Sequence, residues 1–190
     1  MLMKNLLSIL TIIILITACK KSSTPAIVLH KIGDSYQGGI VAYVLQPGDP
    51  GYDGNVEHGL IAATQDQSTG IPWWIGTNVI VGGTSTAFGT GSANTTAIIT
   101  AQGNPTDSNY AANLCRNYAG GGYHDWFLPS QDELNKLYLK VGFVGGFSSV
   151  GYWSSSEYAG CCAWAQGFGG AGYFYNDKNN PSFVRAVRAF

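Results

Sequence analysis

The sequence predicts an α+β fold in which short antiparallel strands are combined with two short helices and long Gly-rich loops. Short apolar or alternating runs, each bounded by glycine, proline or asparagine, recur along the chain and are typical of antiparallel hairpins. The i, i+3, i+4 spacing of a helix appears in only two stretches. Glycine supplies 26 of the 190 residues and charged side chains only 11%, which indicates a turn-rich fold with little long helix.

The first 18 residues predict a lipoprotein signal peptide. Lys4 provides a basic start, and the apolar run from Leu6 to Ile16 is too short for an ordinary membrane span. The run ends in Ile16-Thr17-Ala18-Cys19, which resembles the bacterial lipobox, in which cleavage occurs before a cysteine that carries diacylglycerol. We therefore expect Cys19 to be lipidated. An ordinary cleaved signal peptide or an uncleaved anchor is the alternative.

The predicted lipid anchor sets the domain organisation and the location. Residues 19–32 would form a lipidated tether, and residues 33–190 a single domain of ordinary size. A lipid-modified N-terminus attaches a protein firmly to a membrane. We therefore expect the protein in the bacterial cell envelope, at the outer membrane, with the membrane as a partner. The sequence leaves open which side of that membrane the domain faces and the oligomeric state.

The charge balance argues against nucleic acid as a partner. Lys and Arg together number 10 and Asp and Glu 11, so the formal net charge is −1. A nucleic-acid or heparin-type surface needs a clear excess of basic residues. Aromatic residues make up 13% of the chain, which together with the low charge is typical of an extracytoplasmic fold.

Two short runs predict the first pair of strands. Gly38 to Leu45 is apolar and is bounded by a Gly-Gly pair and by Pro47-Gly48, and Gly59 to Ala63 is its expected partner. His58, at the start of the second run, is expected to form hydrogen bonds rather than bind a metal, because no His or Cys lies at metal-site spacing.

The loop between these strands is acidic. Asp49, Asp53 and Glu57 alternate around glycines, as carboxylates do in calcium-binding loops. The spacing does not fit the EF-hand pattern, and no flanking helices are evident. We interpret the segment as a polar hairpin loop, with calcium at these three carboxylates as the weaker alternative. No catalytic metal and no cofactor are expected.

The middle of the chain predicts a flexible insertion followed by a helix. Gly82 to Ala101 is rich in Gly, Thr, Ser and Ala, and is interpreted as the insertion. Helical spacing resumes from Thr106 to Tyr118, and Gly120-Gly121-Gly122 ends it. The candidate N-caps are Thr106, Asp107 and Ser108.

The second predicted helix begins after Ser130. Ser130 and Glu133 have the spacing of a capping box, in which each side chain accepts a hydrogen bond from the other residue's backbone amide. The residues that follow at helical spacing form one buried face: Leu134, Leu137, Tyr138 and Val141. Gly142 offers the end of the helix.

The C-terminal third predicts antiparallel strands joined by tight turns. The predicted strands are Tyr152–Ser156, Ala163–Phe168, Tyr173–Tyr175 and Phe183–Phe190, and Asn176–Pro181 is turn material. Alternation places Tyr173 and Tyr175 on one face of their strand and Phe174 on the other. We expect the tyrosines to point outward, because their hydroxyls tolerate water better than Phe174 does.

We expect three tryptophans and two arginines to stabilise the fold and not to bind a ligand. Trp126, Trp153 and Trp164 are assigned to the core. Arg185 and Arg188 fall on opposite faces of the last predicted strand, so they cannot form one anion clamp. One of them is expected to pair with an acidic residue, for which the candidates are Glu133, Glu157 and Asp125.

Cysteine parity limits the disulfides. With Cys19 lipidated, Cys115, Cys161 and Cys162 remain, so at most one intrachain bridge can form. Cys115 lies in a helical pattern and is expected to be buried. A Cys161–Cys162 bridge is possible but strained, and a bridge to Cys115 depends on distances that the sequence does not give. We expect no long-range disulfide.

Five stretches, taken in order, resemble one bacterial extracellular family. The stretches are Gly38–Val41, His58–Ala63, Asp125–Leu134, Tyr152–Glu157 and Val184–Arg188. The family is typified by the C-terminal domain of the Legionella collagen-like adhesin, and the resemblance runs from about Gly33 to Phe190. It implies a C-type-lectin-like fold, related in shape to the formylglycine-generating enzymes, and a glycan-binding role on a bacterial surface. The adhesin's domain binds sulfated glycosaminoglycans, for which this chain lacks the basic excess.

The resulting functional hypothesis is a lipid-anchored extracytoplasmic module that binds a glycan or surface polymer without catalysis. Shallow sites of this kind combine aromatic faces with a few polar groups. The candidate ligand-binding residues are Tyr173, Tyr175, Asn176, Lys178 and Asn179. The alternatives are a structural or interaction lipoprotein of the envelope and, less favoured, an enzyme of the formylglycine-generating type, which would need a pair of reactive cysteines.

Overall fold

The structure, a computed structural model, describes residues 29–103 and 109–190. The predicted signal peptide, Cys19 and most of the predicted tether lie outside these residues. So do the candidate helix caps Thr106, Asp107 and Ser108.

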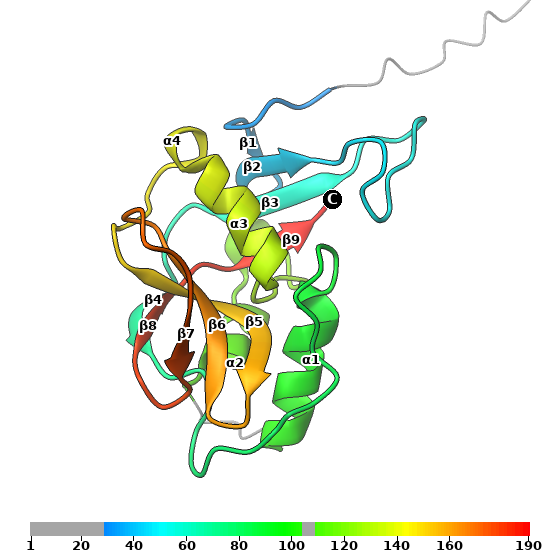
Figure 1. The fold of residues 1–190 in the computed structure, drawn as a ribbon. Coiled ribbons are helices and arrows are strands. Elements are labelled where there is room, and N and C mark those ends of the chain that lie inside the picture. Colours follow the sequence, from blue (N-terminus) through cyan, green and yellow to red (C-terminus); the bar gives the residue numbers. More distant parts are fainter. Residues whose placement is uncertain (1–28, 104–108) are drawn as a thin grey trace, which may run out of the picture.

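In the described residues, the fold consists of two sheets, one antiparallel and one mixed, and four short α-helices (Figure 1). The strands are β1 (Ser35–Tyr36), β2 (Gly39–Val44), β3 (Gly59–Ala63), β4 (Ser68–Ile71), β5 (Gly151–Ala159), β6 (Cys162–Gly167), β7 (Gly172–Asp177), β8 (Ser182–Val184) and β9 (Val187–Ala189). The helices are α1 (Gly91–Gln102), α2 (Ala111–Arg116), α3 (Gln131–Leu139) and α4 (Val141–Val144), with a 3-10 turn at Gly120–Gly122. The predicted α+β class is confirmed.

The first sheet contains strands from both ends of the described chain. The first has the order β1-β2-β3-β9 and the second β4-β8-β5-β6-β7, with one parallel bridge between β5 and β8. The predicted pairing of β2 with β3 is confirmed, and the last strand, β9, returns to lie beside β3.

The prediction of one closing strand over 183–190 is wrong. The chain forms β8 in the second sheet and then β9 in the first, changing sheets at Arg185 and Ala186. Ala63 N donates to Ala186 O, whereas Gln67 N donates to Val184 O, so the backbone carbonyls on either side of Arg185 accept from different parts of the chain. Local alternation carries no information about such a change of partner.

The predicted capping box at α3 is confirmed. Ser130 Oγ accepts from Glu133 N at 3.3 Å, and Glu133 Oε2 accepts from Ser130 N at 2.7 Å. Glu133 is buried, and its Oε1 also accepts from Gly89 N at 3.0 Å. A Cβ at Gly91 would lie 2.2 Å from Glu133 Oε2, which explains the glycine there. Burial raises the pKa of Glu133, against the effect of these backbone donors.

The helix count and several boundaries differ from the prediction. Helix α1 occupies the second half of the segment interpreted as a flexible insertion and ends one residue beyond it. Helix α2 begins only after Tyr110, and Gly142 lies inside α4 instead of ending α3. The inward face of α1 is partly polar: Thr95 Oγ1 accepts from Leu128 N at 3.0 Å, and Asn94 Nδ2 donates to Ser155 Oγ at 3.2 Å. Because specific hydrogen bonds replace an apolar stripe, hydrophobic periodicity could not detect this helix.

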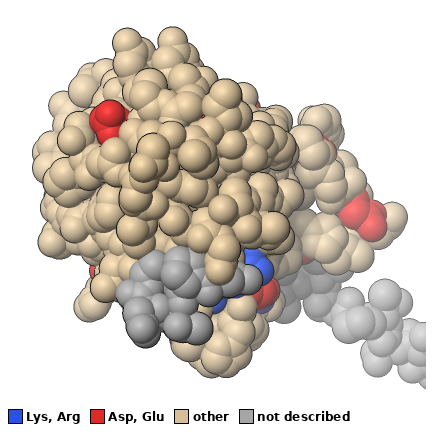
Figure 2. Space-filling view, turned by 90° about the horizontal axis from the view of Figure 1, so that it is seen from below, with Lys and Arg blue, Asp and Glu red and all other residues tan. Residues whose placement is uncertain are grey.

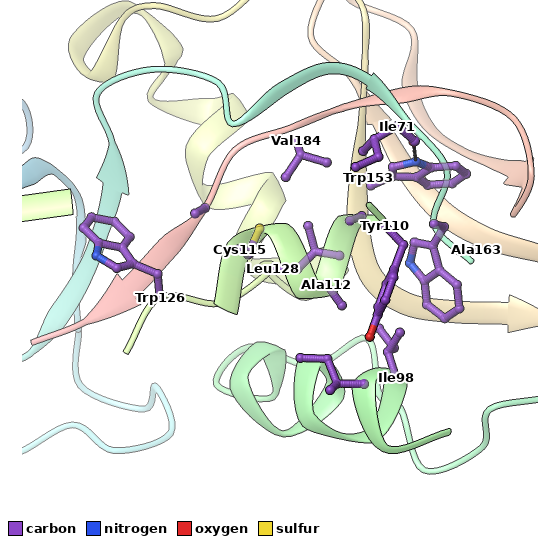
Figure 3. Packing of buried hydrophobic residues seen from close by; sticks show 14 of the residues in the cluster. Ile71, Ile98, Tyr110, Ala112, Cys115, Trp126, Leu128, Trp153, Ala163 and Val184 are labelled. Carbon is purple, nitrogen blue, oxygen red and sulfur yellow. Dashed lines mark hydrogen bonds between the residues drawn. The ribbon is translucent and has the colours of Figure 1, made fainter. Parts of the chain in front are cut away.

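The main core lies between the second sheet and helices α1 and α2 (Figure 3). Trp126 and Trp153 are fully buried in it, as predicted. Trp153 Nε1 donates to Ile71 O at 2.9 Å, and Trp73 Nε1 donates to Ser154 O at 2.7 Å, so the buried indoles also satisfy their polar atoms. A second cluster beneath α3 contains Leu134 and Leu137, and confirms their predicted burial.

Candidate ligand-binding surface

The outer face of β5–β7 carries four aromatic side chains, which we call the aromatic patch: Tyr158, Trp164, Tyr173 and Tyr175. Trp164 lies opposite Tyr175 in the β6–β7 pair, and Gln166 lies opposite Tyr173, so these residues share one face of the sheet. Phe174 lies on the other face and packs against the main core. The predicted outward orientation of the two tyrosines is confirmed.

Three rings of the patch contact one another directly. Tyr158 and Tyr175 are stacked, with centroids 4.4 Å apart and ring planes 8° apart. Trp164 meets Tyr158 edge-on at 4.9 Å and Tyr175 at 6.4 Å. Tyr158 is 49% exposed and Tyr175 55% exposed, whereas Trp164 is half-buried beneath them. The mutual contacts hold a rigid aromatic surface open to solvent.

Tyr173 lies at the end of the patch nearest α3. It is 44% exposed, and its pKa is raised by partial burial and by the neighbouring Asp132 carboxylate. The phenol therefore stays protonated at neutral pH and can both donate and accept a hydrogen bond.

Lys178 does not belong to this surface, which corrects the predicted site. Its side chain is fully buried and pairs with Glu157 at 2.5 Å, while Nζ also donates to Val79 O at 2.7 Å. Glu157 Oε1 and Oε2 accept from the amides of Val81 and Gly82 at 2.8 and 3.0 Å. The pair therefore fixes the 79–82 loop to β5 and to the β7–β8 turn.

The two predicted asparagines differ in their availability. Asn176 is half-buried; its Nδ2 donates to Ser182 Oγ at 3.3 Å, and its Oδ1 accepts from Asn180 Nδ2 at 2.9 Å. Asn179 is exposed, and donates from its backbone N to Asp177 Oδ1 at 2.9 Å. Of the five predicted ligand residues, Tyr173, Tyr175 and Asn179 present exposed side chains.

Sequence reasoning missed the other half of the patch. Trp164, which the sequence assigns to the core, is only half-buried: α3 packs on β6, where Gln166 and Phe168 are buried, and Trp164 lies nearer the β5–β6 turn. Tyr158 gave no usable signal, because β5 changes register between Trp153 and Ala159 and alternation along it is lost.

The three acidic residues of the calcium alternative do not come together. Asp49 accepts from Tyr43 OH and from Gln46 N, both at 2.7 Å. Asp53 accepts from Asn55 N at 2.8 Å, and Glu57 pairs with His30 at 2.6 Å. Among residues 29–103 and 109–190, no group of three His, Cys, Asp or Glu side chains could hold a metal ion.

Both arginines of the C-terminal segment have structural partners. Arg188 binds Asp125 through two hydrogen bonds of 2.8 and 2.7 Å, which confirms one of the predicted pairs. Arg188 holds the pKa of Asp125 below its usual range. Arg185 is buried and binds Asp66 at 2.7 Å, a partner that was not foreseen.

The described cysteines offer no exposed pair of thiols. Cys161 and Cys162 are bonded to each other in the β5–β6 turn, and Cys115 is free and fully buried. Burial strongly raises the pKa of the Cys115 thiol. The expectation of no long-range disulfide is confirmed for these three residues.

Few charged side chains show on the lower end of the molecule. They lie in a few separate places, in one of which basic and acidic side chains adjoin (Figure 2). In the part of the chain that the structure describes, no helix is both long and apolar enough to cross a membrane.

These features define an α+β domain that exposes an aromatic patch on a weakly charged surface. Residues 62–188 match the model of the Lcl C-terminal domain, and the chain belongs to that family. Its fold is similar to the crystal structure of a fimbrial protein from Bacteroides ovatus, with a TM-score of 0.52 and 15% sequence identity. The match covers 78% of this chain and 43% of the fimbrial protein, less than half of that protein's length. No curated protein matches the chain.

Proposed function

We propose that this protein is an extracytoplasmic binding module with an adhesion-type role, which holds an uncharged glycan on its aromatic patch. The single observation that carries the proposal is the exposed, mutually packed group of Tyr158, Trp164 and Tyr175. Aromatic rings of this kind pack against the apolar faces of sugars. The Tyr173 hydroxyl on the same strand and the exposed Asn179 amide in the turn that follows β7 can supply hydrogen bonds for sugar hydroxyls.

Two properties of the surroundings support an uncharged ligand. Lys178, Arg185 and Arg188 all have acidic partners, so none of them is free to hold a sulfate group. The face in Figure 2 also lacks the cluster of basic side chains that a polyanion would need. Membership of the Lcl C-terminal domain family and the fold of the fimbrial protein support a place outside the cytoplasm.

In this proposal, the protein is anchored to a membrane by a lipid and acts by binding, without catalysis. Lipidation at Cys19 would place the domain on the cell envelope, at the outer membrane. A formylglycine-generating type of reaction needs two reactive cysteines. The bonded state of Cys161 and Cys162 and the burial of Cys115 support a binding role instead.

A glycan array probed with the full chain in mild detergent tests the proposal. We expect binding to neutral oligosaccharides, and a loss of roughly tenfold or more in affinity when Tyr173 and Tyr175 are both replaced by Ala. Because both side chains are exposed, the melting temperature should change little.

A matched control separates the patch from general surface effects. Tyr52 is 43% exposed and lies in the acidic hairpin loop, so Tyr52→Ala should leave glycan binding unchanged. No binding to any neutral or acidic glycan would favour the interaction-lipoprotein alternative. A large fall in the melting temperature of the double variant would place the two tyrosines in the core and remove the proposed site.

A further inference from the structure

Strand β7 forms a free edge of the second sheet with unpaired backbone groups. Lys178 N donates to Cys161 O at 2.9 Å, and opposite residues in an antiparallel pair exchange hydrogen bonds at every second position. By this alternation Phe174 bonds to β6, whereas Tyr173 and Tyr175 direct their N–H and C=O groups away from it. Within the described ranges, these outward groups have no hydrogen-bond partner.

The other sheet edges are short, irregular or covered. At the β9 edge, Phe127 N donates to Val187 O at 2.8 Å and Val187 N donates to Phe127 O at 2.9 Å. Strand β1 has two residues, and the pairing of β4 is irregular. Strand β7 spans six residues, pairs with β6 without a bulge, and has no Lys or Pro to block further pairing.

We propose that β7 pairs with β7 of a second copy of this chain, antiparallel, about a two-fold axis at Phe174. The sequence Tyr173-Phe174-Tyr175 is the same in both directions, so the axis sets Tyr173 opposite Tyr175 of the second copy. The backbone groups of both positions point outward. Four interchain N–H···O bonds then form without disturbing the pairing with β6.

The side chains on the outer face fit this register. On the outer face, each Tyr173 packs beside Tyr175 of the second copy, a favourable cross-strand aromatic pair. The one charged residue of β7, Asp177, falls opposite Ala171 of the second copy, so no like charges oppose each other. The two aromatic patches become one continuous surface across the dimer. The pairing itself rests on β7 and does not depend on glycan binding.

A cysteine cross-linking experiment with the full chain in mild detergent tests the register. Directly opposite, hydrogen-bonded residues have Cα atoms about 5.5 Å apart, within the range of a disulfide, whereas the same residue in the two copies lies roughly 8 Å or more apart. A mixture of Tyr173→Cys and Tyr175→Cys chains should therefore cross-link under mild oxidation, and each variant alone should not. The parent chain controls for its own cysteines. No cross-link in the mixture, or equal cross-linking in all samples, would overturn the register.

Charge substitutions at Ala171 give a second test that leaves the aromatic patch intact. Ala171 is exposed, and Ala171→Asp would face Asp177 of the second copy twice per dimer, whereas Ala171→Lys would face it with the opposite charge. In sedimentation equilibrium of the full chain, the Asp variant should self-associate roughly three- to tenfold more weakly than the parent, and the Lys variant more strongly. A monomeric parent, or equal effects of both variants, would contradict the proposal. Tyr158→Ala should weaken glycan binding and leave self-association unchanged, which separates the two claims.

Discussion

At the scale of single residues, buried carboxylates connect loops of this protein to its regular elements. Glu133 binds the amides of Ser130 and Gly89, and Glu157 binds Lys178 and the amides of Val81 and Gly82. A buried carboxylate without such donors would be strongly destabilising. These donors therefore allow Glu133 and Glu157 to lie largely inside the protein.

The capping box predicts the effect of one substitution. Ser130→Ala removes the acceptor for Glu133 N and should lower the free energy of unfolding by about 1 kcal/mol, as for other N-cap serines. Urea denaturation followed by tryptophan fluorescence measures it. Ser92→Ala is the control, because Ser92 is exposed on α1 and its hydroxyl forms no hydrogen bond in the described chain. Equal effects of both changes would show that the cap does not stabilise the protein.

The Glu157 carboxylate predicts a pH dependence. Burial alone would raise its pKa, but Lys178 and the amides of Val81 and Gly82 lower it overall from the ordinary value of 4.5. A lowered folded-state pKa stabilises the protein fully above the unfolded value, and this contribution is lost as the pH falls through the folded-state pKa. Glu157→Gln should therefore destabilise the protein at pH 7, and less so below pH 4.5. A difference from the parent that stays constant down to low pH would contradict this assignment.

Much at this scale could be predicted, because the relevant partners are close in sequence. The Ser130–Glu133 cap and the alternation of Tyr173, Phe174 and Tyr175 depend on spacings of two or three residues, and both predictions hold. Lys178 could not be placed, because its partner Glu157 belongs to another strand and its charge suggested an exposed side chain.

At the scale of elements, apolar periodicity predicted α3 and could not predict α1. Leu134 and Leu137 of α3 pack on the second core cluster, whereas α1 turns Asn94 and Thr95 toward the protein interior. Tertiary hydrogen bonds stabilise α1, so its sequence resembles that of a loop. Tyr158 could not be placed for a different reason: its position in the patch follows from the irregular register of β5.

Two leucines on α3 provide a matched test of its buried face. Leu137 is fully buried and Leu139 is 62% exposed. Leu137→Ala should lower the free energy of unfolding by about 2–5 kcal/mol through lost contacts and the cavity it leaves. Leu139→Ala should change it by less than about 0.5 kcal/mol. Denaturation midpoints of the two variants measure the contrast, and a larger effect at Leu139 would reverse the assigned orientation of the helix.

At the scale of the whole molecule, the arrangement of the two sheets was beyond prediction. Strands β8 and β9 are separated by only two residues and join different sheets: Val184 O accepts from Gln67 N, whereas Ala186 O accepts from Ala63 N of β3. The overall α+β class followed from strand lengths and turn residues, which are local properties. The family itself was predicted from short motifs spread along the chain, and residues 62–188 match that family.

The proposed lipid anchor can be tested on the whole chain. Cys19→Ala should move the protein from the membrane fraction to the soluble fraction, or leave an uncleaved precursor of larger apparent mass, because the modified cysteine would be absent. Cell fractionation and gel mobility report both outcomes. Cys115→Ala is the control, since Cys115 is buried and has no role in anchoring. An unchanged distribution and mobility of Cys19→Ala would exclude the anchor.

The most direct test of the central claim is the affinity of the full chain for a neutral oligosaccharide, measured by titration at low and high salt. If the aromatic patch holds the sugar, the affinity should stay nearly constant between about 50 and about 500 mM salt, because no charges are paired. Replacing Tyr158 and Tyr175 by Ala should reduce it roughly tenfold or more. An affinity that falls steeply with salt, or that is unchanged in the double variant, would contradict an aromatic site for an uncharged glycan.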